Sequence, residues 1–161
     1  MAAYPSVWQR EQEEIEANVQ RKIAMELATY PDIERVRIAY GDAGVIPFFT
    51  RSLWLDPVGL NDSFLARSQD RASSVDYFFE QEPDLVIQPV TSAGDPIDFG
   101  HGLLGDYASW ADDERWSAYR SVGTLSRNDA PYFLEFLVKS GSGQADELTD
   151  FVTDRLAVLS Q

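Results

Sequence analysis

The chain has 161 residues, of which 44% are hydrophobic and 12% aromatic, a composition sufficient for one folded domain with a buried core. Its 27 acidic and 13 basic residues give a net charge of −14, which argues against nucleic acid and anionic membrane surfaces as partners, because both require clustered Lys and Arg. The sequence contains no Cys, so disulfides, thiolate metal sites and catalysis by Cys are excluded.

The charge also bears on the source of the protein. Lys22 and Lys139 are the only lysines, and the remaining basic residues are arginines. An acidic surface with so few lysines favours a haloarchaeal or similarly salt-adapted source, because carboxylates hold water while concentrated salt screens their repulsion. The alternative is an ordinary acidic protein. No apolar run approaches the roughly 20 residues of a membrane helix, and residues 1–14 lack a signal-peptide core, so we expect a soluble chain.

The first part of the chain predicts a long amphipathic helix followed by two short strands. The helix covers about residues 6–30, with Ser6 as N-cap and Pro31 as its end. Residues 35–40 and 52–57 read as strands, and residues 43–51 between them as a short helix or a turn. The buried stripe of the long helix consists of apolar residues spaced by four, at Ile15, Val19, Ile23 and Leu27.

The middle of the chain alternates between helix and strand. Residues 61–69 predict one or two helical turns capped by Asn61 or Asp62. Residues 73–83 predict a helix capped by Ser73 or Ser74, and residues 84–90 predict a strand that is apolar enough to be buried on both faces. A Gly-, Pro- and Asp-rich loop follows at residues 91–106, and residues 106–119 predict a further helix.

The last part predicts two adjacent strands, residues 119–126 and 131–140, and a final helix within residues 140–161. The order of elements predicts an α/β fold: a mixed, largely parallel sheet of about five strands flanked by helices, with Rossmann-like layering and a C-terminal antiparallel hairpin. No repeat or linker divides the sequence, so we expect residues 1–161 to form a single domain. The final helix carries its apolar residues on one side, at Leu148, Val152, Leu156 and Leu159.

Two carboxylates, Asp42 and Asp56, stand just after the first two predicted strands. Because the carboxyl ends of parallel strands share one edge of a sheet, the two side chains are candidates for binding a cation or a sugar hydroxyl there. The alternative is that each carboxylate caps a short helix or ties a loop by accepting main-chain N–H bonds. Asp followed by Gly is common after strands for that structural reason alone, and the residues by themselves favour it.

A longer pattern surrounds these carboxylates. The stretch VRIAYGDAGVIPFFTRSLWLDPVGLNDSFLAR (residues 36–67), then EPDLVI (82–87) and the two C-terminal strands, resembles the soluble C-terminal domain of GT-C type membrane glycosyltransferases. These polytopic enzymes use lipid-phosphosugars and are protein-mannosyltransferase-like or arabinofuranosyltransferase-like. The resemblance covers about residues 10–140. The matching residues are Asp42, Ala43 and Gly44 in a first element, Asp56, Gly59, Leu60 and Asp62 in a second, and Pro83 and Asp84 in a third.

The resemblance implies an α/β domain on the extracytoplasmic face of the cell membrane, packed on the membrane-embedded catalytic part of the same or a partner protein. In that family the catalytic carboxylate lies in a loop between membrane helices, and this sequence contains no such helix. The resemblance therefore implies an accessory domain with no catalytic residue, cofactor or metal of its own. Such a domain would assist the binding of a glycan acceptor or brace the catalytic part.

Two other functions stay open. The first is a metal-assisted hydrolase that uses Asp42, Asp56 and His101, the only histidine, although a lone His without paired ligand spacing is usually a loop residue. The second is a free-standing acidic protein-interaction module. An exposed apolar patch would favour the accessory domain or the interaction module, whereas a divalent ion between the aspartates would favour the hydrolase.

The candidate ligand-binding residues are those of the carboxylate turns together with His101 and one nearby aromatic residue. Trp54 stands between the two turns, and its flat ring suits stacking on a sugar. Tyr107, Trp110, Trp116 and Tyr119 extend the same idea, although most aromatic residues in a domain of this size lie in the core. The full candidate set is Asp42, Asp56, Asn61, Asp62, His101 and Trp54.

Overall fold

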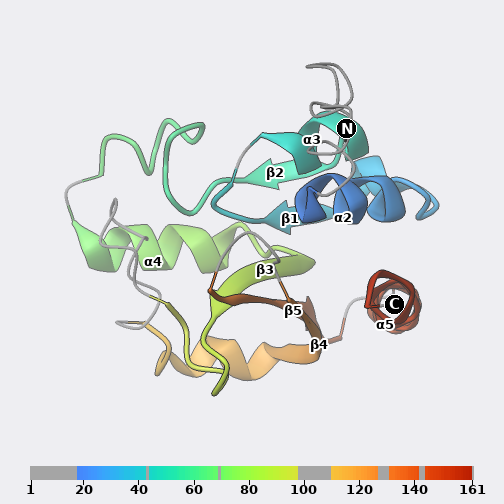
Figure 1. The fold of residues 1–161 in the computed structure, drawn as a ribbon. Helices are drawn as coiled ribbons and strands as arrows, with labels where there is room; N and C mark the ends of the chain where they lie inside the picture. The colour runs from blue at the N-terminus through green and yellow to red at the C-terminus, as the bar shows by residue number, and fades with distance from the viewer. Residues whose placement is uncertain are drawn as a thin grey trace, which may run out of the picture.

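A computed structural model describes residues 18–42, 44–68, 70–97, 110–126, 131–141 and 144–160. They confirm the predicted α/β fold, with a five-stranded mixed sheet in the order β2-β1-β3-β5-β4 (Figure 1). β1 pairs in parallel with both β2 and β3, and β5 pairs antiparallel with β3 and β4. The strands are β1 (Arg37–Ala39), β2 (Leu53–Leu55), β3 (Leu85–Val90), β4 (Tyr119–Ser126) and β5 (Phe133–Lys139).

β3 is the central strand of this sheet. All six of its residues are buried, as its unbroken apolar run predicts. β2 and β4 are the two edge strands, and β2 is only three residues long. The predicted antiparallel hairpin therefore adds its second strand, β5, to the parallel half of the sheet, while β4 closes the far edge.

Three helices cover one face of the sheet: α2 (Val19–Leu27), α3 (Val45–Thr50) and α5 (Ala145–Leu159) (Figure 1). The apolar positions predicted for α2 and α5 enter this core, where Ile23, Leu148 and Val152 are almost fully buried. α2 begins at Asn18, whose side-chain oxygen accepts the N–H of Arg21 at 3.0 Å. α2 therefore begins at Asn18, inside the range of residues 6–30 predicted for one continuous helix, and the predicted cap at Ser6 lies outside the described residues.

The opposite face is covered by α4 (Arg71–Glu80) and by the short 3-10 helix η3 (Glu114–Ala118). Phe78, Trp110 and Leu137 are central to this second core. The predicted helix over residues 106–119 is wrong in its described part, residues 110–118, which form a turn followed by η3. Local bonds explain the difference, because Asp113 accepts the N–H of Arg115 at 3.0 Å and the Trp116 indole N–H donates to the Trp110 carbonyl at 2.9 Å.

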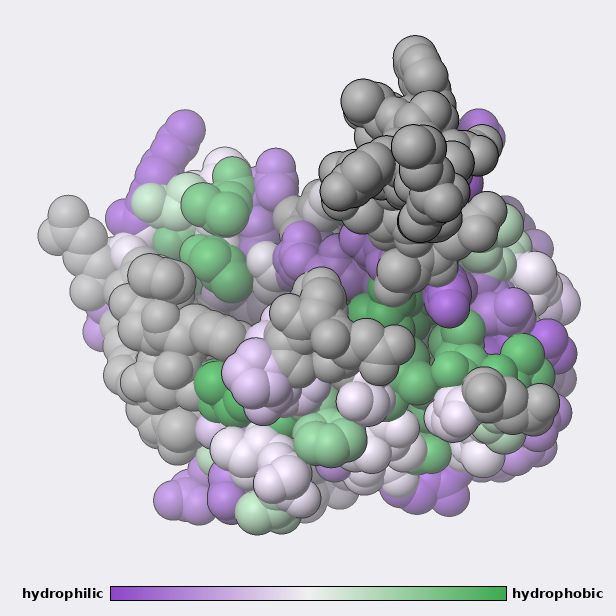
Figure 2. Space-filling view, in the orientation of Figure 1, coloured by the Kyte–Doolittle hydropathy of each residue, from purple (hydrophilic) through white to green (hydrophobic). Residues whose placement is uncertain are grey.

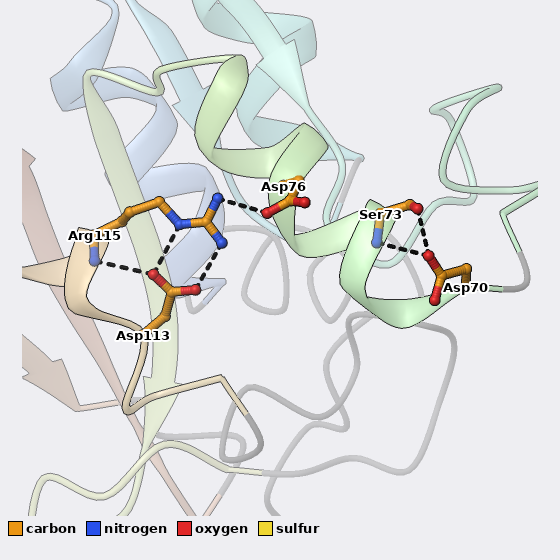
Figure 3. Close-up of polar contacts among 5 residues, drawn as sticks. All are labelled: Asp70, Ser73, Asp76, Asp113 and Arg115. Carbon is orange, nitrogen blue, oxygen red and sulfur yellow. Dashed lines mark hydrogen bonds and ion pairs between the residues drawn. The ribbon is translucent and has the colours of Figure 1, made fainter.

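The cap predicted for α4 at Ser73 or Ser74 is also wrong. The helix begins earlier, with Asp70 as N-cap, and the carboxylate of Asp70 accepts both the main-chain N–H of Ser73, at 3.1 Å, and its hydroxyl (Figure 3). Ser74 is buried and donates its hydroxyl to the carbonyl of Asp70 at 3.0 Å. Both serines therefore lie in the first turn and bind the cap residue.

A polar contact joins η3 to α4 (Figure 3). The Arg115 guanidinium bonds Asp113 through Nε at 2.8 Å and Nη2 at 2.7 Å, and bonds Asp76 of α4 through Nη1 at 2.8 Å. The same guanidinium lies 4.4 Å from the ring centre of Phe79 in α4. The bonds from Arg115 hold the pKa of the Asp113 carboxyl below its usual value.

Candidate functional site

The sheet brings the carboxyl ends of β1 and β2 side by side, because these strands pair in parallel with Ala39 opposite Leu55. Asp42 and Asp56 follow these strands, so both lie at the end of the sheet where β1 and β2 terminate. The order β2-β1-β3 places the topological switch point between β1 and β3, where open α/β sheets most often bind ligands. Asp42 follows a strand that borders this point, whereas Asp56 follows the strand farther out.

Asp56 is held by the chain around it. Its side chain is only 1% exposed, and one oxygen accepts the main-chain N–H groups of Val58 and Gly59, at 3.0 and 3.2 Å. The other oxygen accepts the main-chain N–H of Asn61 at 2.8 Å and its side-chain amide at 3.4 Å. These bonds fit the structural role that the sequence left open, in which the carboxylate organises a turn.

Asp62 organises the second half of the same loop. One of its oxygens accepts the N–H groups of Phe64 and Leu65, at 2.9 and 3.1 Å, and the other accepts the hydroxyl of Tyr77 in α4 at 3.0 Å. Partial burial, and then the bond to Asp62, raise the pKa of Tyr77. Residues 63–67 form turns rather than a regular helix, with Asp62 in the capping role predicted for Asn61 or Asp62.

Residues 56–68, which we name the β2–α4 loop, also depend on a glycine. Gly59 has φ +85°, in the left-handed region that favours glycine. A Cβ at this position would lie 3.1 Å from the main-chain N of Ala66 and 3.1 Å from the carbonyl carbon of Leu65. The loop thus folds back on itself at Gly59, and its two halves are in close contact.

Asp42 has a different setting. It is exposed, and its carboxylate accepts a hydrogen bond from the side-chain amide of Gln20 in α2. The same amide nitrogen lies 3.2 Å from the hydroxyl of Tyr40. Asp42 therefore keeps open access to solvent beside the switch point, while its one described contact joins the end of β1 to the start of α2.

The aromatic residues of this set that the structure describes do not form the exposed platform that the sequence allowed. Trp54 is half-buried and packs edge-on against Tyr40, with ring centres 6.3 Å apart. Trp110 and Trp116 belong to the cluster under α4, with ring centres 5.4 Å apart, and Tyr119 packs edge-on against Trp116. Burial also raises the pKa of Tyr119. Tyr107 and His101 lie outside the described residues.

The hydrolase hypothesis finds no support in these contacts. Within residues 18–97 as described, and in the described segments after residue 110, no three His, Asp or Glu side chains gather where they could hold a metal ion. The oxygens of Asp56 already accept four hydrogen bonds. In the same part of the chain, no helix is long and apolar enough to cross a membrane.

The feature that the sequence reasoning missed is a set of exposed apolar side chains. Five of the seven large hydrophobic residues that are exposed in the described part of the chain fall between residues 48 and 64, in α3, in β2 and in the β2–α4 loop. Two adjacent Phe residues in a six-residue helix were a signal for it, since they cannot both face the core. We name this set, whose members precede, lie in or follow β2 along the chain, the β2-edge surface: Phe48, Phe49, Leu53, Leu60 and Phe64.

Comparison with known proteins gives one match. Residues 8–140 match the family described as a domain of unknown function, DUF8728. No curated protein and no solved structure matches the chain. The description of the family names no activity, so only the residues and their geometry point to a function.

Proposed function

The chain belongs to the DUF8728 family, and we propose that it is a non-catalytic accessory domain that braces the membrane-embedded catalytic part of a glycosyltransferase. The domain docks through its β2-edge surface and lies on the extracytoplasmic face of the membrane. The resemblance of residues 36–67 and 82–87 to the soluble domains of GT-C type enzymes supports this choice of partner. The acidic composition supports a salt-adapted source.

The β2-edge surface is the observation that carries the docking role. Phe48 is 77% exposed and Leu60 is 79% exposed, although a folded chain gains free energy by burying such side chains. Only three charged residues occur between residues 44 and 64, and the carboxylates of Asp56 and Asp62 are bound within the loop. Arg51 is therefore the one charge there without a described bond. In a chain of net charge −14, such a surface favours contact with an apolar partner.

The other edge of the sheet differs. The exposed residues of β4 are all polar: Arg120, Ser121, Thr124 and Ser126. This contrast supports the β2 edge as the place of the proposed interaction site. This polarity difference favours a docking domain over a domain that is active on its own.

The settings of the carboxylates also support a role in bracing the catalytic part more than a role in binding a glycan. A glycan acceptor would need hydrogen-bonding groups that face solvent, but Asp56 is buried and Asp62 bonds Tyr77 and two main-chain N–H groups. Asp42 and Asn61 remain exposed and are the candidates for a weaker glycan contact.

The test is co-sedimentation of the purified chain with membranes washed from the source cells, in molar salt. We expect saturable binding, which Phe48→Ser weakens about tenfold, because a central apolar contact is worth more than 1 kcal/mol at an interface. Val158→Ser is the matched control, since Val158 is exposed in α5, away from the β2 edge, and its loss should leave binding unchanged.

The partner is identified with a photo-crosslinking residue in place of Phe48. A polytopic glycosyltransferase in the crosslinked product supports the proposal, and a different crosslinked protein contradicts the choice of partner. Absence of membrane binding by the wild-type chain contradicts the accessory role itself.

A further inference from the structure

A cavity of about 150 Å³ lies between η3 and the face of the sheet that carries the second core. Gln88 of β3 and Leu137 of β5 line it from the sheet, and Trp116 of η3 lines it from the other side, together with Pro96 and Ala111. A cavity of this size accommodates a molecule such as benzene. Because β3 and β5 lie away from the β2 edge, a function of this cavity does not depend on the docking proposed above.

Gln88 gives the cavity a polar group of fixed orientation. Its residue is only 7% exposed, and its amide nitrogen donates to Oε2 of Glu135, its partner in β5, at 2.8 Å. Because a carboxylate only accepts hydrogen bonds, the nitrogen must face Glu135, and the amide oxygen makes no bond to another described residue. The indole N–H of Trp116 is already bonded to the carbonyl of Trp110, at 2.9 Å. The side chains that line the cavity therefore offer an acceptor and no free donor.

Glu135 adds a negative charge at the border of this cavity. It is bonded to Gln88 and stands two residues from Leu137 on the same face of β5, so lining residues flank it on two sides. Glu135 is half-buried and makes no ion pair with any residue that the structure describes, and Lys139 of the same strand bonds Glu82 instead. A carboxylate partly removed from water costs free energy unless a cation compensates its charge.

The surroundings of the cavity carry the same sign of charge. The exposed carboxylates of Asp95 and Asp112 adjoin the lining residues Pro96 and Ala111. Figure 2 shows mostly pale residues, of intermediate hydropathy, at the bottom of the view, where η3 lies in Figure 1, with purple residues at their border. This part of the molecule therefore favours a positively charged ligand over an anionic one.

We propose that the cavity binds a small organic cation, a protonated amine carried on an apolar ring. The ammonium group donates to Glu135 and to the amide oxygen of Gln88, and the ring packs against Trp116 and Leu137. A protonated amine has only donors, which match the free acceptors, and its charge compensates that of Glu135. The aromatic ring of Trp116 also favours a nearby cation. An anion would find no donor among the lining side chains, and a neutral ligand would leave the charge of Glu135 uncompensated.

The test is calorimetric titration of the purified chain, in molar salt at pH 7, with benzylamine, benzyl alcohol and benzoate. These probes have nearly the same size and are cationic, neutral and anionic. We expect benzylamine to bind about tenfold more tightly than benzyl alcohol, because hydrogen bonds between charged groups are the stronger ones, and benzoate not to bind. Molar salt screens the general attraction of a cation to an acidic surface, whereas a partly buried contact is screened much less.

Three variants locate the binding. Glu135→Gln keeps an acceptor for the amide of Gln88 and removes only the charge, so it should weaken benzylamine about tenfold and leave benzyl alcohol unchanged. Asp112→Asn is the matched control, because it removes an exposed carboxylate beside Ala111, and it should bind benzylamine as the wild type does. Ala111→Phe fills the cavity from its exposed side and should abolish binding of both probes. Urea unfolding should show Glu135→Gln to be as stable as the wild type or more stable, since an uncompensated charge is removed.

Five results overturn the proposal. They are no binding of benzylamine, equal binding of benzylamine and benzyl alcohol, wild-type affinity in Glu135→Gln or Ala111→Phe, equal weakening by Asp112→Asn and Glu135→Gln, and tighter binding of Nα-acetyl-lysine amide than of benzylamine. The fourth result would reduce the effect to general attraction by the acidic surface, and the fifth would assign the cavity to a lysine side chain of a partner protein. Failure of membrane binding ends the proposed function and leaves this cavity unaffected.

Discussion

Replacing Asp56 with Asn tests whether this carboxylate holds the fold or serves a ligand. The change keeps the size of the side chain and replaces one acceptor oxygen with an NH₂ group. If the remaining oxygen stays on Val58 and Gly59, the N–H of Asn61 then faces a donor in place of the oxygen that now lies 2.8 Å away. If the amide turns over, the N–H groups of Val58 and Gly59 lose their acceptor instead.

The cost follows from these two arrangements. A donor left without its partner in a poorly solvated place costs about 1–3 kcal/mol. The bonds lost here are to a charged acceptor, and such bonds are stronger than those between neutral groups. Since Asp56 is 1% exposed, water cannot readily replace the missing oxygen. We therefore expect Asp56→Asn to lower the free energy of unfolding by about 2–3 kcal/mol. Asp56→Ala removes both oxygens and should cost about 3–5 kcal/mol.

The assay is equilibrium unfolding in urea, followed by Trp fluorescence, with Asp42→Asn as the matched control. Asp42 also follows a strand, but it is exposed and its one described contact is with Gln20. Its replacement should change the free energy of unfolding by less than about 0.5 kcal/mol. The slope of unfolding free energy against urea should stay the same in both variants, because neither changes the surface that unfolding exposes.

A carboxylate kept for ligand binding behaves in the opposite way. Removing such a group often leaves stability unchanged or raises it, because functional groups are commonly held against their own preference. If Asp56→Asn is as stable as the wild type or more stable, the turn role is wrong and the binding hypothesis for Asp56 returns.

Two further predictions concern the loop and the contact in Figure 3. Gly59→Ala should lower the free energy of unfolding in urea by about 2–3 kcal/mol, and Gly94→Ala by only about 1 kcal/mol. Both glycines have positive φ, but only at Gly59 would a Cβ meet other atoms of the loop. Equal losses would contradict the close packing of the loop. Since its folded pKa is lowered, Asp113 contributes stability that is present above its unfolded pKa of about 3.9 and lost as pH falls through the folded value. Arg115→Met should therefore lower the free energy of unfolding by about 1–2 kcal/mol at pH 7 and by progressively less below pH 4, and a difference independent of pH would contradict this origin.

Much of the sheet is predictable from the sequence, because its strands have strong local signals. The strand predicted at residues 119–126 matches β4, and the run at residues 84–90 differs from β3 by one residue. The alternation of strand and helix fixes the parallel half, since each crossover must be long enough to reverse the chain. The errors lie where short polar side chains compete for main-chain N–H groups, at Asp70 before α4 and at Asp113 before η3.

The candidate site was only partly predictable for a related reason. The spacing of Asp56, Gly59 and Asp62 marks a turn, but a carboxylate before a turn looks the same whether its oxygens face the main chain or a ligand. The exposure of Phe48 and Leu60 depends on which elements lie above them, and that is decided by the order of strands in the sheet. Periodicity identifies apolar residues, but it does not reveal that β2 would become an edge strand of the sheet that the described residues form.

The two edge strands of this sheet are protected to different degrees, and the difference supports the place that we propose for docking. An edge strand exposes main-chain groups that can pair with another chain, so stable domains protect such strands. β4 has two protective features: its exposed side chains are polar, and its pairing with β5 is interrupted by a register shift between Ser121 and Gly123. The one such feature of β2 is that it is only three residues long, and exposed apolar residues precede and follow it. A docked protein that covers this edge would bury those residues and supply the protection that the sequence builds into β4, which is why we propose the β2 edge as the docking side of the domain.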